Sequence, residues 1–369
     1  MDEIHKADPH KKIIMLELRG KLDKNTSLYL GLLGVVIFIA VWWGLAESFA
    51  TYKSPEDMVL AGLVDSTALD SLKKVNAMGQ KVYPLLPRPD KVFKSYASLW
   101  QDDQLWHHTL RSIWLNLKGY FWAIIIAIPL GFVIGLFPIF RGLFSKQVDA
   151  LRYLPLSALT GLFIIWFGIE DQMKIAFLAF GILVYLLPVV VQRIDEVDDV
   201  YVKTLHTLGA RNWDTIKQVF IPAVGSKLID DIRVLTAISW TYIIIAELLN
   251  RAGGIGSLIF TKARQGQIDK VFAVLIVIVL IGFIQDRIFA YMDKRLYPHK
   301  YETIKTKSNG DIQIGILLLL GFGVLKIMQE IFWSAGSEIF NPIVWIGCVG
   351  ALLYILYGEF ISKNVVKNV

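Results

Sequence analysis

The feature that most constrains this chain is a series of apolar runs, each long enough to cross a lipid bilayer as a helix. The hydrocarbon core of a bilayer is about 30 Å thick, and a helix of roughly 20 residues spans it. Hydrophobic residues make up 55% of the 369 residues, and the mean hydropathy is +0.52. The runs predict spans at residues 28–46, 115–136, 151–167, 173–191, 235–249, 271–290, 312–331 and 342–360. We therefore expect an all-α polytopic membrane protein.

The formal net charge is +6, and the Lys and Arg residues concentrate in alternate loops between the predicted spans. They lie before the first span, after the second, within residues 203–227, after the sixth and at the end of the chain. Short cytoplasmic loops carry an excess of Lys and Arg, so this pattern indicates membrane orientation and not nucleic-acid binding. We expect both termini to be cytoplasmic.

The first apolar run follows a long charged segment and precedes no small-residue cleavage signal, so we expect a retained anchor and not a removed signal peptide. Cys348 is the only cysteine in the sequence. A single cysteine excludes an intrachain disulfide framework and a metal site built from a cysteine cluster. His107 and His108 are adjacent and therefore do not face one site on a helix, and no third ligand is near in sequence, so we expect no metal site.

The spans and loops divide the chain into segments of different character. Residues 47–107 form the longest predicted external loop, in which Val92, Tyr96 and Leu99 share one face of an interfacial helix. The segments we expect are a cytoplasmic start (1–27), the first span (28–46), the external loop (47–107), a core (108–298), a cytoplasmic linker (299–311) and an appended two-span hairpin (312–369).

The polar loop at residues 195–222 joins two strongly apolar helices and has helical periodicity of its own. Gly209 can adopt a positive φ that ends one short helix, Asn212 can cap the next, and Asp214 favours its N-terminal dipole. Each half of the loop has an apolar face: Val202, Leu205 and Leu208 in the first, and Trp213, Ile216 and Phe220 in the second. We expect a bent element on the cytoplasmic side that binds another protein; the alternative is a helix that rests on lipid headgroups.

A set of short motifs lies in a characteristic order between about Leu86 and His299. The motifs are Leu86-Pro87-Arg88-Pro89, His108 to Leu115, Ile128-Pro129-Leu130-Gly131, Leu154-Pro155-Leu156, Ile165 to Ile169, Ile221-Pro222, Ala246-Glu247, Gly253-Gly254-Ile255-Gly256, Asp286-Arg287 and Arg295 to Pro298. Together with the polar loop, they resemble the permease subunit of bacterial binding-protein-dependent ABC importers, in the nitrate/sulfonate/taurine branch. The resemblance implies a six-span type I permease core, to which the last two spans are an addition.

In that family the Glu-Ala-Ala loop carries a coupling helix that docks on the cytoplasmic ATPase subunit. Leu208-Gly209-Ala210 match the family pattern, whereas Lys203-Thr204-Leu205 stand where Glu-Ala-Ala would be and Ser226 replaces the usual second proline. The resemblance thus implies docking, with a reversed charge at Lys203 that bears on which ATPase is recognised. The residues assigned to the ATPase-coupling loop are Val202, Lys203, Leu205, Leu208, Gly209, Ala210, Arg211, Asn212, Trp213, Ile216, Phe220 and Pro222.

The resemblance also implies the partners. We expect a second permease copy in a homodimer, cytoplasmic ATP-binding subunits, an external solute-binding protein and surrounding membrane lipid, in the bacterial inner membrane, and no nucleic acid. The chain itself is expected to be no enzyme and to bind no cofactor, because ATP and Mg belong to the partner ATPase.

Some residues are candidates for the translocation path or gate. Glu247 is a candidate because acids inside a membrane are commonly functional; the alternative is an i,i+4 ion pair with Arg251 worth about 0.3 to 0.5 kcal/mol. Trp240 and Thr241 lie near mid-span, with packing as the alternative. Gly253, Gly254 and Gly256 lack the lysine and Ser/Thr of a nucleotide-binding loop, so we expect a tight turn or a re-entrant gate element there.

The external segment after the fifth span is an exception to the charge pattern, because it is basic. It carries Arg251, Lys262, Arg264 and Lys270, with only Asp269 to offset them. Our hypothesis is that these residues bias the outer mouth toward a small oxyanion such as nitrate, a sulfonate, taurine or bicarbonate. The alternatives are contact with an acidic face of the binding protein and simple tolerance of charge beside an established span.

Taken together, the sequence predicts the transmembrane permease subunit of an ATP-driven solute importer. The alternative is an ATPase-independent secondary transporter or channel, which would favour charged or discontinuous helices near the bilayer midplane and inverted repeats. A membrane enzyme is a third reading, but the predicted spans contain no nucleophile with a nearby base. The sequence names neither the solute nor the role of the appended hairpin.

Overall fold

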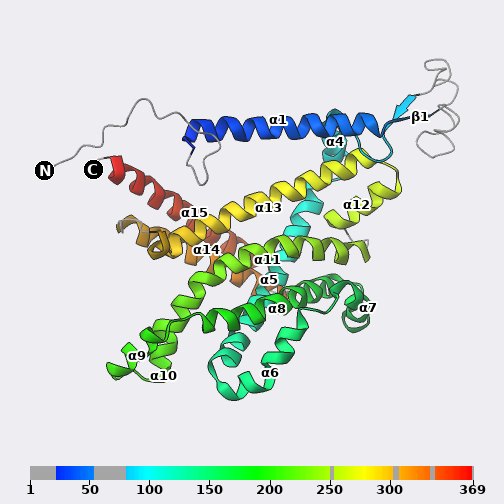
Figure 1. Ribbon diagram of the computed structural model, residues 1–369. Coiled ribbons are helices and arrows are strands. Elements are labelled where there is room, and N and C mark those ends of the chain that lie inside the picture. The colour runs from blue at the N-terminus through cyan, green and yellow to red at the C-terminus, as the bar shows by residue number, and fades with distance from the viewer. Residues whose placement is uncertain (1–21, 54–79, 250–252, 302–306, 333–336, 368–369) are drawn as a thin grey trace. The chain divides into compact units, whose positions relative to one another are not determined.

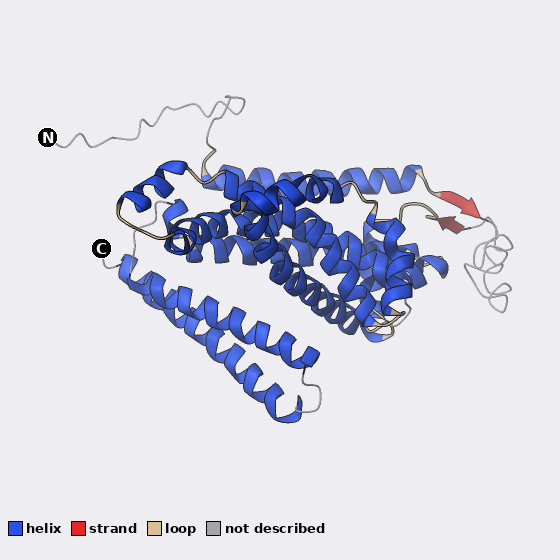
Figure 2. Ribbon diagram, turned by 90° about the horizontal axis from the view of Figure 1, so that it is seen from below, coloured by secondary structure: helices blue, strands red, loops and turns tan. Residues whose placement is uncertain are grey.

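The computed structural model describes residues 22–53, 80–249, 253–301, 307–332 and 337–367, almost all of them helical (Figures 1 and 2). The long helices are α1 (Lys24–Ser48), α5 (Leu105–Leu136), α8 (Asp171–Asp195), α11 (Ile221–Leu249), α13 (Ile268–Leu296), α14 (Lys307–Phe332) and α15 (Ser337–Lys367). The shorter elements are β1 (Thr51–Lys53), β2 (Gln80–Val82), α4 (Pro89–Gln101), α6 (Pro138–Leu151), α7 (Leu156–Phe167), α9 (Asp199–Thr207), α10 (Asn212–Thr215), a π-helix (Ile216–Phe220), α12 (Ile255–Arg264) and a 3₁₀ turn (Pro298–Tyr301).

Six described helices are long and apolar enough to cross a membrane: α1, α5, α8, α13, α14 and α15. α11 is not among them, although it contains the predicted span 235–249, because Asp230, Asp231, Arg233 and Glu247 limit its uncharged stretch. The fold is thus all-α and polytopic, as the sequence predicts.

One predicted span is wrong in its boundaries. Residues 151–167 do not form one helix, because α6 ends at Leu151, α7 begins at Leu156, and the two helices are bent by 105°. Pro155 precedes α7 in an extended conformation and disfavours helical backbone at the residue before it. This membrane segment is therefore a broken pair of helices.

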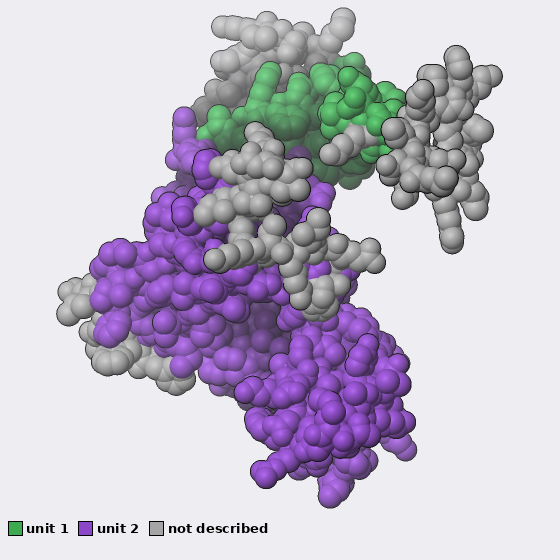
Figure 3. All heavy atoms as spheres, turned by 90° about the vertical axis from the view of Figure 1, so that its left-hand side faces the viewer, with its two compact units in different colours: residues 1–98, 262–273 green, residues 99–261, 274–369 purple. Residues whose placement is uncertain are grey.

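The chain separates into two compact units (Figure 3). The first comprises residues 1–98 and 262–273, and within it β1 and β2 pair antiparallel with Thr51 opposite Val82. Trp42 Nε1 donates to the Pro87 carbonyl at 3.0 Å, and the Tyr96 hydroxyl donates to the Ala273 carbonyl at 2.9 Å. These bonds join α1, α4 and the start of α13 within that unit.

The second unit, residues 99–261 and 274–369, is built around the packing of α5 on α8 and of α8 on α11. Glycines let α5 and α8 approach closely, as expected for helices inside a membrane. A Cβ at Gly119 would lie 2.6 Å from the Leu178 Cβ, and one at Gly131 would lie 2.6 Å from a Val190 methyl. The buried core beside this contact includes Tyr120, Ala123, Ile182, Leu186, Val190 and Leu228.

The appended hairpin consists of α14 and α15, which pack on each other and are tied to the rest of the second unit at both ends. Glu359 of α15 accepts a hydrogen bond from the Tyr291 hydroxyl at 2.7 Å and pairs with Arg295, both on α13. Glu330 of α14 pairs with Lys118 of α5 at 2.6 Å. The hairpin is therefore held by ion pairs at its two ends.

The orientation predicted from the charge pattern can be tested by cysteine labelling in intact cells. Cys348→Ala provides a cysteine-free background, and Ser308→Cys should resist an impermeant thiol reagent because residue 308 is predicted to be cytoplasmic. Gln104→Cys, on the predicted external side, is the positive control. Efficient external labelling at residue 308 would show that the predicted orientation is wrong.

Candidate functional site

The polar loop at 195–222 is anchored at its base by a network of ion pairs, here called the clamp: Arg193, Glu196, Lys227 and Asp231. Arg193, near the end of α8, donates two hydrogen bonds to Asp231 of α11, each at 2.7 Å. Arg193 also donates to Glu196 at 2.8 Å, and Lys227 donates to Glu196 at 2.9 Å. Bidentate guanidinium–carboxylate pairs fix orientation as well as distance. The clamp thus joins the helix that enters the loop to the helix that leaves it.

Glu196 lies just beyond the end of α8, and its pKa is lowered to about 2. The main causes are the hydrogen bonds from Lys227 and Arg193, which favour the ionised carboxylate. A lowered pKa stabilises the folded state above the ordinary pKa of a glutamate, and this contribution is lost only as the pH falls toward 2. Glu196 is therefore ionised at neutral pH.

Each end of α9 is set by a local feature, a side-chain cap at the N-terminus and a left-handed glycine after the C-terminus. Asp198 is its N-cap, and the Asp198 carboxylate accepts a hydrogen bond from the Val200 backbone N–H at 2.9 Å. At its C-terminus, Gly209 has a φ of +80°, and the Ala210 N–H donates to the Leu205 carbonyl at 3.0 Å. A left-handed glycine followed by such a bond is a common way to end a helix. The expected turn at Gly209 is confirmed.

The N-cap of α10 lies one residue earlier than expected. Arg211 is the N-cap, with extended backbone, and Asn212 is the first helical residue, so the assignment of Asn212 as the cap is wrong. The reason is that the Asp214 carboxylate reaches back to accept the Arg211 N–H at 3.1 Å, half of a capping box. The π-helix then widens one turn before α11 begins at Ile221.

The exposed apolar surface of the loop differs from the faces that spacing predicts. Val202, Leu205, Ile216 and Phe220 are half-buried, so a large part of each predicted face turns toward the protein itself. The surface here called the docking face consists of two residues of the predicted faces, Leu208 and Trp213, which are 77% and 68% exposed, and two additional residues, Val200 and Tyr201, which are 61% and 62% exposed. Figure 1 shows α9 and α10 at one end of the bundle.

The remaining loop residues assigned from the sequence lie at or near the surface. Lys203 is largely exposed and pairs with Asp199 one turn earlier at 3.5 Å. Arg211 and Pro222 are exposed, and Ala210 is half-buried. The helical spacing did not identify Val200 and Tyr201 as part of the exposed surface. The only signal in the sequence is that these two apolar residues directly follow Asp199 at the start of the polar loop.

Glu247 lies at the opposite end of the bundle, fully buried, and holds the start of α12. Ser112 Oγ donates to one carboxylate oxygen of Glu247 at 2.6 Å, and the Gly256 N–H donates to the other at 2.8 Å. The Ile255 N–H in turn donates to Ser112 Oγ at 2.9 Å. A carboxylate at a helix N-terminus satisfies N–H groups that have no partner within the helix. Glu247 thus has a structural role in this arrangement, and its proposed partner Arg251 lies outside the described residues.

The two glycines before α12 fit this arrangement. Gly254 has a φ of +110°, and a Cβ there would lie 2.2 Å from the Glu247 carboxylate carbon. The Gly254 N–H donates to His108 Nδ1 at 2.9 Å, and Gly253 also has a positive φ, of +101°. The glycine motif is therefore a tight turn built around the carboxylate.

The other path candidates separate into a packed residue and a surface residue. Trp240 is buried, and its Nε1 donates to Gln285 of α13 at 3.0 Å. Thr241 is exposed, and its hydroxyl donates to the Ile238 carbonyl within the same helix at 2.5 Å. Among the described residues, His, Cys, Asp and Glu form no group of three that could hold a metal ion.

The basic residues after α11 also differ in exposure. Lys262 is buried and donates to Gln265 at 3.1 Å, whereas Arg264 is exposed and Lys270 is half-buried. All three belong to the first compact unit. The anion hypothesis therefore rests on Arg264 and Lys270 more than on Lys262.

The fold and site together define a class: a multi-pass helical membrane protein with a clamped amphipathic loop at one end of the bundle. Residues 119–297 match the family described as binding-protein-dependent transport system inner membrane component. The matched range includes the clamp, α9 to α12 and Glu247, and it ends before α14. Over residues 119–297 the chain therefore carries the domain of this family.

Several named proteins are similar to the chain. The taurine transport system permease of Escherichia coli is 24% identical over 289 residues, which covers 77% of this chain and 93% of that protein. A protein of Bacillus subtilis described as an aliphatic sulfonates transport permease is 24% identical over 230 residues, covering 62% and 83%. The nitrate import permease of Leptolyngbya laminosa is 25% identical over 191 residues, covering 49% and 64%.

A solved structure is also similar. A chain from the inward-facing MetNI methionine ABC transporter has a TM-score of 0.42 and 18% sequence identity, and the match covers 52% of this chain and 98% of that one.

The contact between Glu247 and Gly254 predicts a sharp steric effect. Gly254→Ala should destabilise the purified permease by about 1 to 3 kcal/mol from backbone strain alone, with the clash against Glu247 adding to it. Gly282→Ala is the matched control, because a Cβ there meets nothing within 4 Å. Thermal unfolding followed by tryptophan fluorescence measures both; equal stability of the two variants would contradict the assigned role of the glycine turn.

Proposed function

We propose that this permease works as a two-fold dimer with two cytoplasmic ATP-binding subunits and an external solute-binding protein. The observation that carries the proposal is the docking face: Leu208 and Trp213 are 77% and 68% exposed on a loop whose base is fixed by the clamp. Large apolar side chains held outward on a rigid support are typical anchors of protein interfaces. In this proposal the chain performs no chemistry, and ATP and Mg bind in the partner.

The clamp suggests how movement of the ATPase reaches the membrane. If the ATP-binding subunits close, they displace residues 200–220, and Arg193 carries the displacement to α8 and α11 together because it bonds to Glu196 and Asp231 at once. Alternating access by domain closure requires rigid bodies that move as units. The proposal is that the loop, α8 and α11 form such a unit.

Lys203 bears on the choice of ATPase. Its ammonium is exposed on α9, at the position where the family has a glutamate, and its pair with Asp199 is a surface pair at 3.5 Å. Such pairs are worth at most about 1 kcal/mol, so the lysine is free to meet a partner. We infer that the matching ATPase surface is acidic.

The solute we propose is a small oxyanion or organic anion. The named relatives transport taurine, aliphatic sulfonates and nitrate, each of which presents an anionic oxygen group. In this chain Arg264 is exposed at the end of α12, and positive charge at a solute entrance raises the local anion concentration. Bicarbonate belongs to the same chemical class.

The docking face can be tested by comparing two kinds of variant. Trp213→Ala and Leu208→Ser should weaken co-purification of the ATPase by about 2 kcal/mol or more each and reduce uptake, because they remove interface anchors. Arg193→Gln should reduce uptake while the ATPase still co-purifies, because it breaks transmission and not docking. Trp345→Ala is the matched control, since Trp345 is 63% exposed on α15. Full uptake and ATPase recovery in all docking-face variants would refute the proposed coupling role.

The solute class predicts an effect of charge at the outer segment. Arg251→Gln combined with Arg264→Gln should lower uptake of an anionic solute by about tenfold at low ionic strength and less at high salt. The affinity of the binding protein for the permease, measured separately, should not change. Loss of that affinity alone, or transport of a cationic solute, would show that the anion proposal is wrong.

A further inference from the structure

Two polar side chains of the second unit, Asn116 on α5 and Lys174 on α8, are buried without a hydrogen bond to any residue that the structure describes. They are 2% and 0% exposed. Neither the oxygen nor the nitrogen of the Asn116 amide has a partner, and the Lys174 ammonium has an ion pair with Asp171 at 3.2 Å but no hydrogen bond. Buried polar groups in proteins nearly always have hydrogen-bond partners, so these groups need an explanation.

The Asn116 side chain lies on a face of α5 that contacts two other helices. Ser112, Asn116 and Gly119 follow one another at a spacing of one helical turn, so they share this face. Ser112 donates to Glu247 of α11 at 2.6 Å. A Cβ on Gly119 would lie 2.6 Å from the Leu178 Cβ on α8. Asn116, between these two contacts, therefore faces both α8 and α11.

The Lys174 side chain lies on the corresponding face of α8. Lys174, Leu178 and Gly181 also follow one another at a spacing of one turn. Leu178 meets α5, and a Cβ on Gly181 would lie 3.0 Å from the Tyr242 ring of α11. The positive charge of Lys174 also acts on the Glu247 carboxylate. Both buried side chains thus belong to one place, the junction of α5, α8 and α11.

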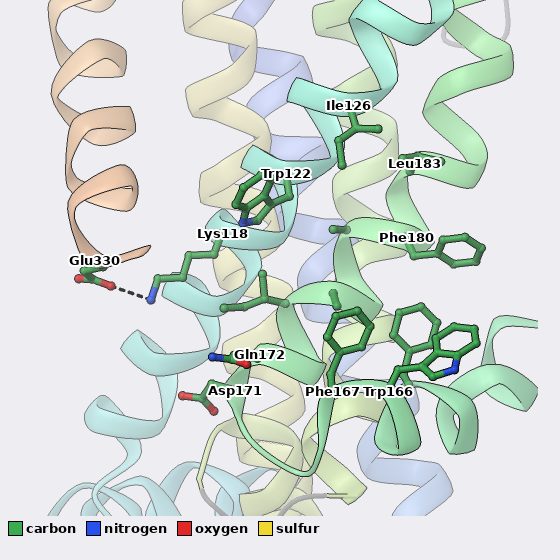
Figure 4. Close-up of a pocket in the computed structure, with 14 residues that line it drawn as sticks. Lys118, Trp122, Ile126, Trp166, Phe167, Asp171, Gln172, Phe180, Leu183 and Glu330 are labelled. Carbon is green, nitrogen blue, oxygen red and sulfur yellow. Dashed lines mark ion pairs between the residues drawn. The ribbon is translucent and has the colours of Figure 1, made fainter. Parts of the chain in front are cut away.

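Contacts on either side place Asn116 and Lys174 at about the same level of the junction. Toward the start of both helices, Arg111 of α5 pairs with Asp171 of α8 at 3.0 Å. Figure 4 shows Asp171 beside the apolar groove that α5, α7 and α8 line. Toward the end of both helices, α5 meets α8 at Gly119. The level between these two contacts is the one that the two buried side chains occupy.

The charges at the junction argue for a neutral occupant. Arg111 and Lys174 offset the carboxylates of Asp171 and Glu247, so a bound ion would disturb an existing balance. The occupant is also small, because the two unpaired side chains are closed off from the surface. The amide needs a donor and an acceptor, and the ammonium needs acceptors. A water molecule supplies both.

We propose that ordered water occupies the junction of α5, α8 and α11 and bridges Lys174 Nζ to the Asn116 amide. A buried water typically makes about three hydrogen bonds to groups that otherwise have no partner. Held in this way, Lys174 is the counter-charge of Glu247, whose carboxylate accepts the Gly256 N–H at the start of α12. The clamp joins α8 to α11 at one end, and this hydrated junction joins them at the other, independently of the solute and the ATPase.

The first test applies millisecond X-ray radiolysis to the purified full-length permease, because radiolysis oxidises side chains that lie next to bound water. Water labelled with heavy oxygen, mixed in just before the exposure, distinguishes bound water from bulk water. Leu115 and Leu178 lie within one turn of the proposed site and are 2% and 0% exposed. Both should be oxidised with unlabelled oxygen. Leu186 is the matched control, because it is fully buried in the apolar core of the same helix as Leu178 and should stay unmodified.

The second test replaces the amide by an apolar group of similar size. Asn116→Leu should lower the Tm by about 4 °C or more, because the water loses a partner and Lys174 loses its bridge. Oxidation of Leu178 should disappear in the same variant. An amide that has no partner at all predicts the opposite result, a higher Tm, since its burial costs free energy that leucine does not.

The third test addresses the charge of Lys174. Lys174→Met should lower the Tm because it leaves the buried Glu247 carboxylate without a counter-charge. Adding Glu247→Gln should recover part of that loss, as expected for two groups that interact. Lys146→Met, at an exposed position of α6, is the matched control and should leave the Tm unchanged.

The wild-type measurement does not depend on any variant folding. Equal oxidation of Leu178 and Leu186 there would overturn the proposal, and a direct bond between Lys174 and Asn116 would then be the better account of the junction. A Tm of Asn116→Leu at or above the wild-type value would overturn it as well. So would a Lys174→Met variant whose Tm does not recover at all when Glu247→Gln is added.

Discussion

The guanidinium of Arg193 is the group on which the loop at residues 195–222 depends. It bonds to Asp231 across two helices and to Glu196 beyond the end of its own, so that α8, the loop and α11 share one anchor. A cation that is partly removed from water stabilises the fold only when acceptor groups take the hydrogen bonds that its N–H groups donate. The hydrogen bonds that Arg193 donates to Asp231 and Glu196 are all charge-assisted. The loop whose base these bonds fix also carries the exposed apolar side chains of Leu208 and Trp213. In the proposed function, this anchor lets the loop act as a rigid lever between the membrane helices and the ATP-binding subunits.

The opposite end of the bundle uses a carboxylate for a related purpose. Glu247 is taken wholly out of water, which is costly for a carboxylate, and the bonds from Ser112 and Gly256 offset that cost. The turn at Gly254 is the geometric condition for it, since any side chain at that position would occupy the space of the carboxylate. The structural role of Glu247 is therefore to hold the N-terminus of α12 in place. Any contribution of Glu247 to a translocation path would act through the position of that helix.

The sequence predicted the long helices correctly, because the apolar membrane interior requires them. It predicted helix ends and breaks less well, because individual side chains determine these. The long apolar runs became helices, and Gly209 adopted the expected left-handed turn. The break between α6 and α7 was missed because hydropathy averages over Pro155, which interrupts the backbone without lowering the apolar content. Asn212 was misassigned because the reach of Asp214 to the Arg211 N–H decides which residue caps the helix.

By itself, the sequence determined that the chain is a helical membrane protein, where its loops divide it and which family its motifs resemble, since these depend on local composition and order. Only the tertiary structure decided which charges meet. Arg193 and Asp231 lie 38 positions apart, and Ser112 and Glu247 lie 135 apart, so no local pattern pairs them. The same holds for the apolar groove that residues of α5, α7 and α8 line together. Contacts between distant segments follow from how helices pack, and packing depends on the shape of every side chain at the interface.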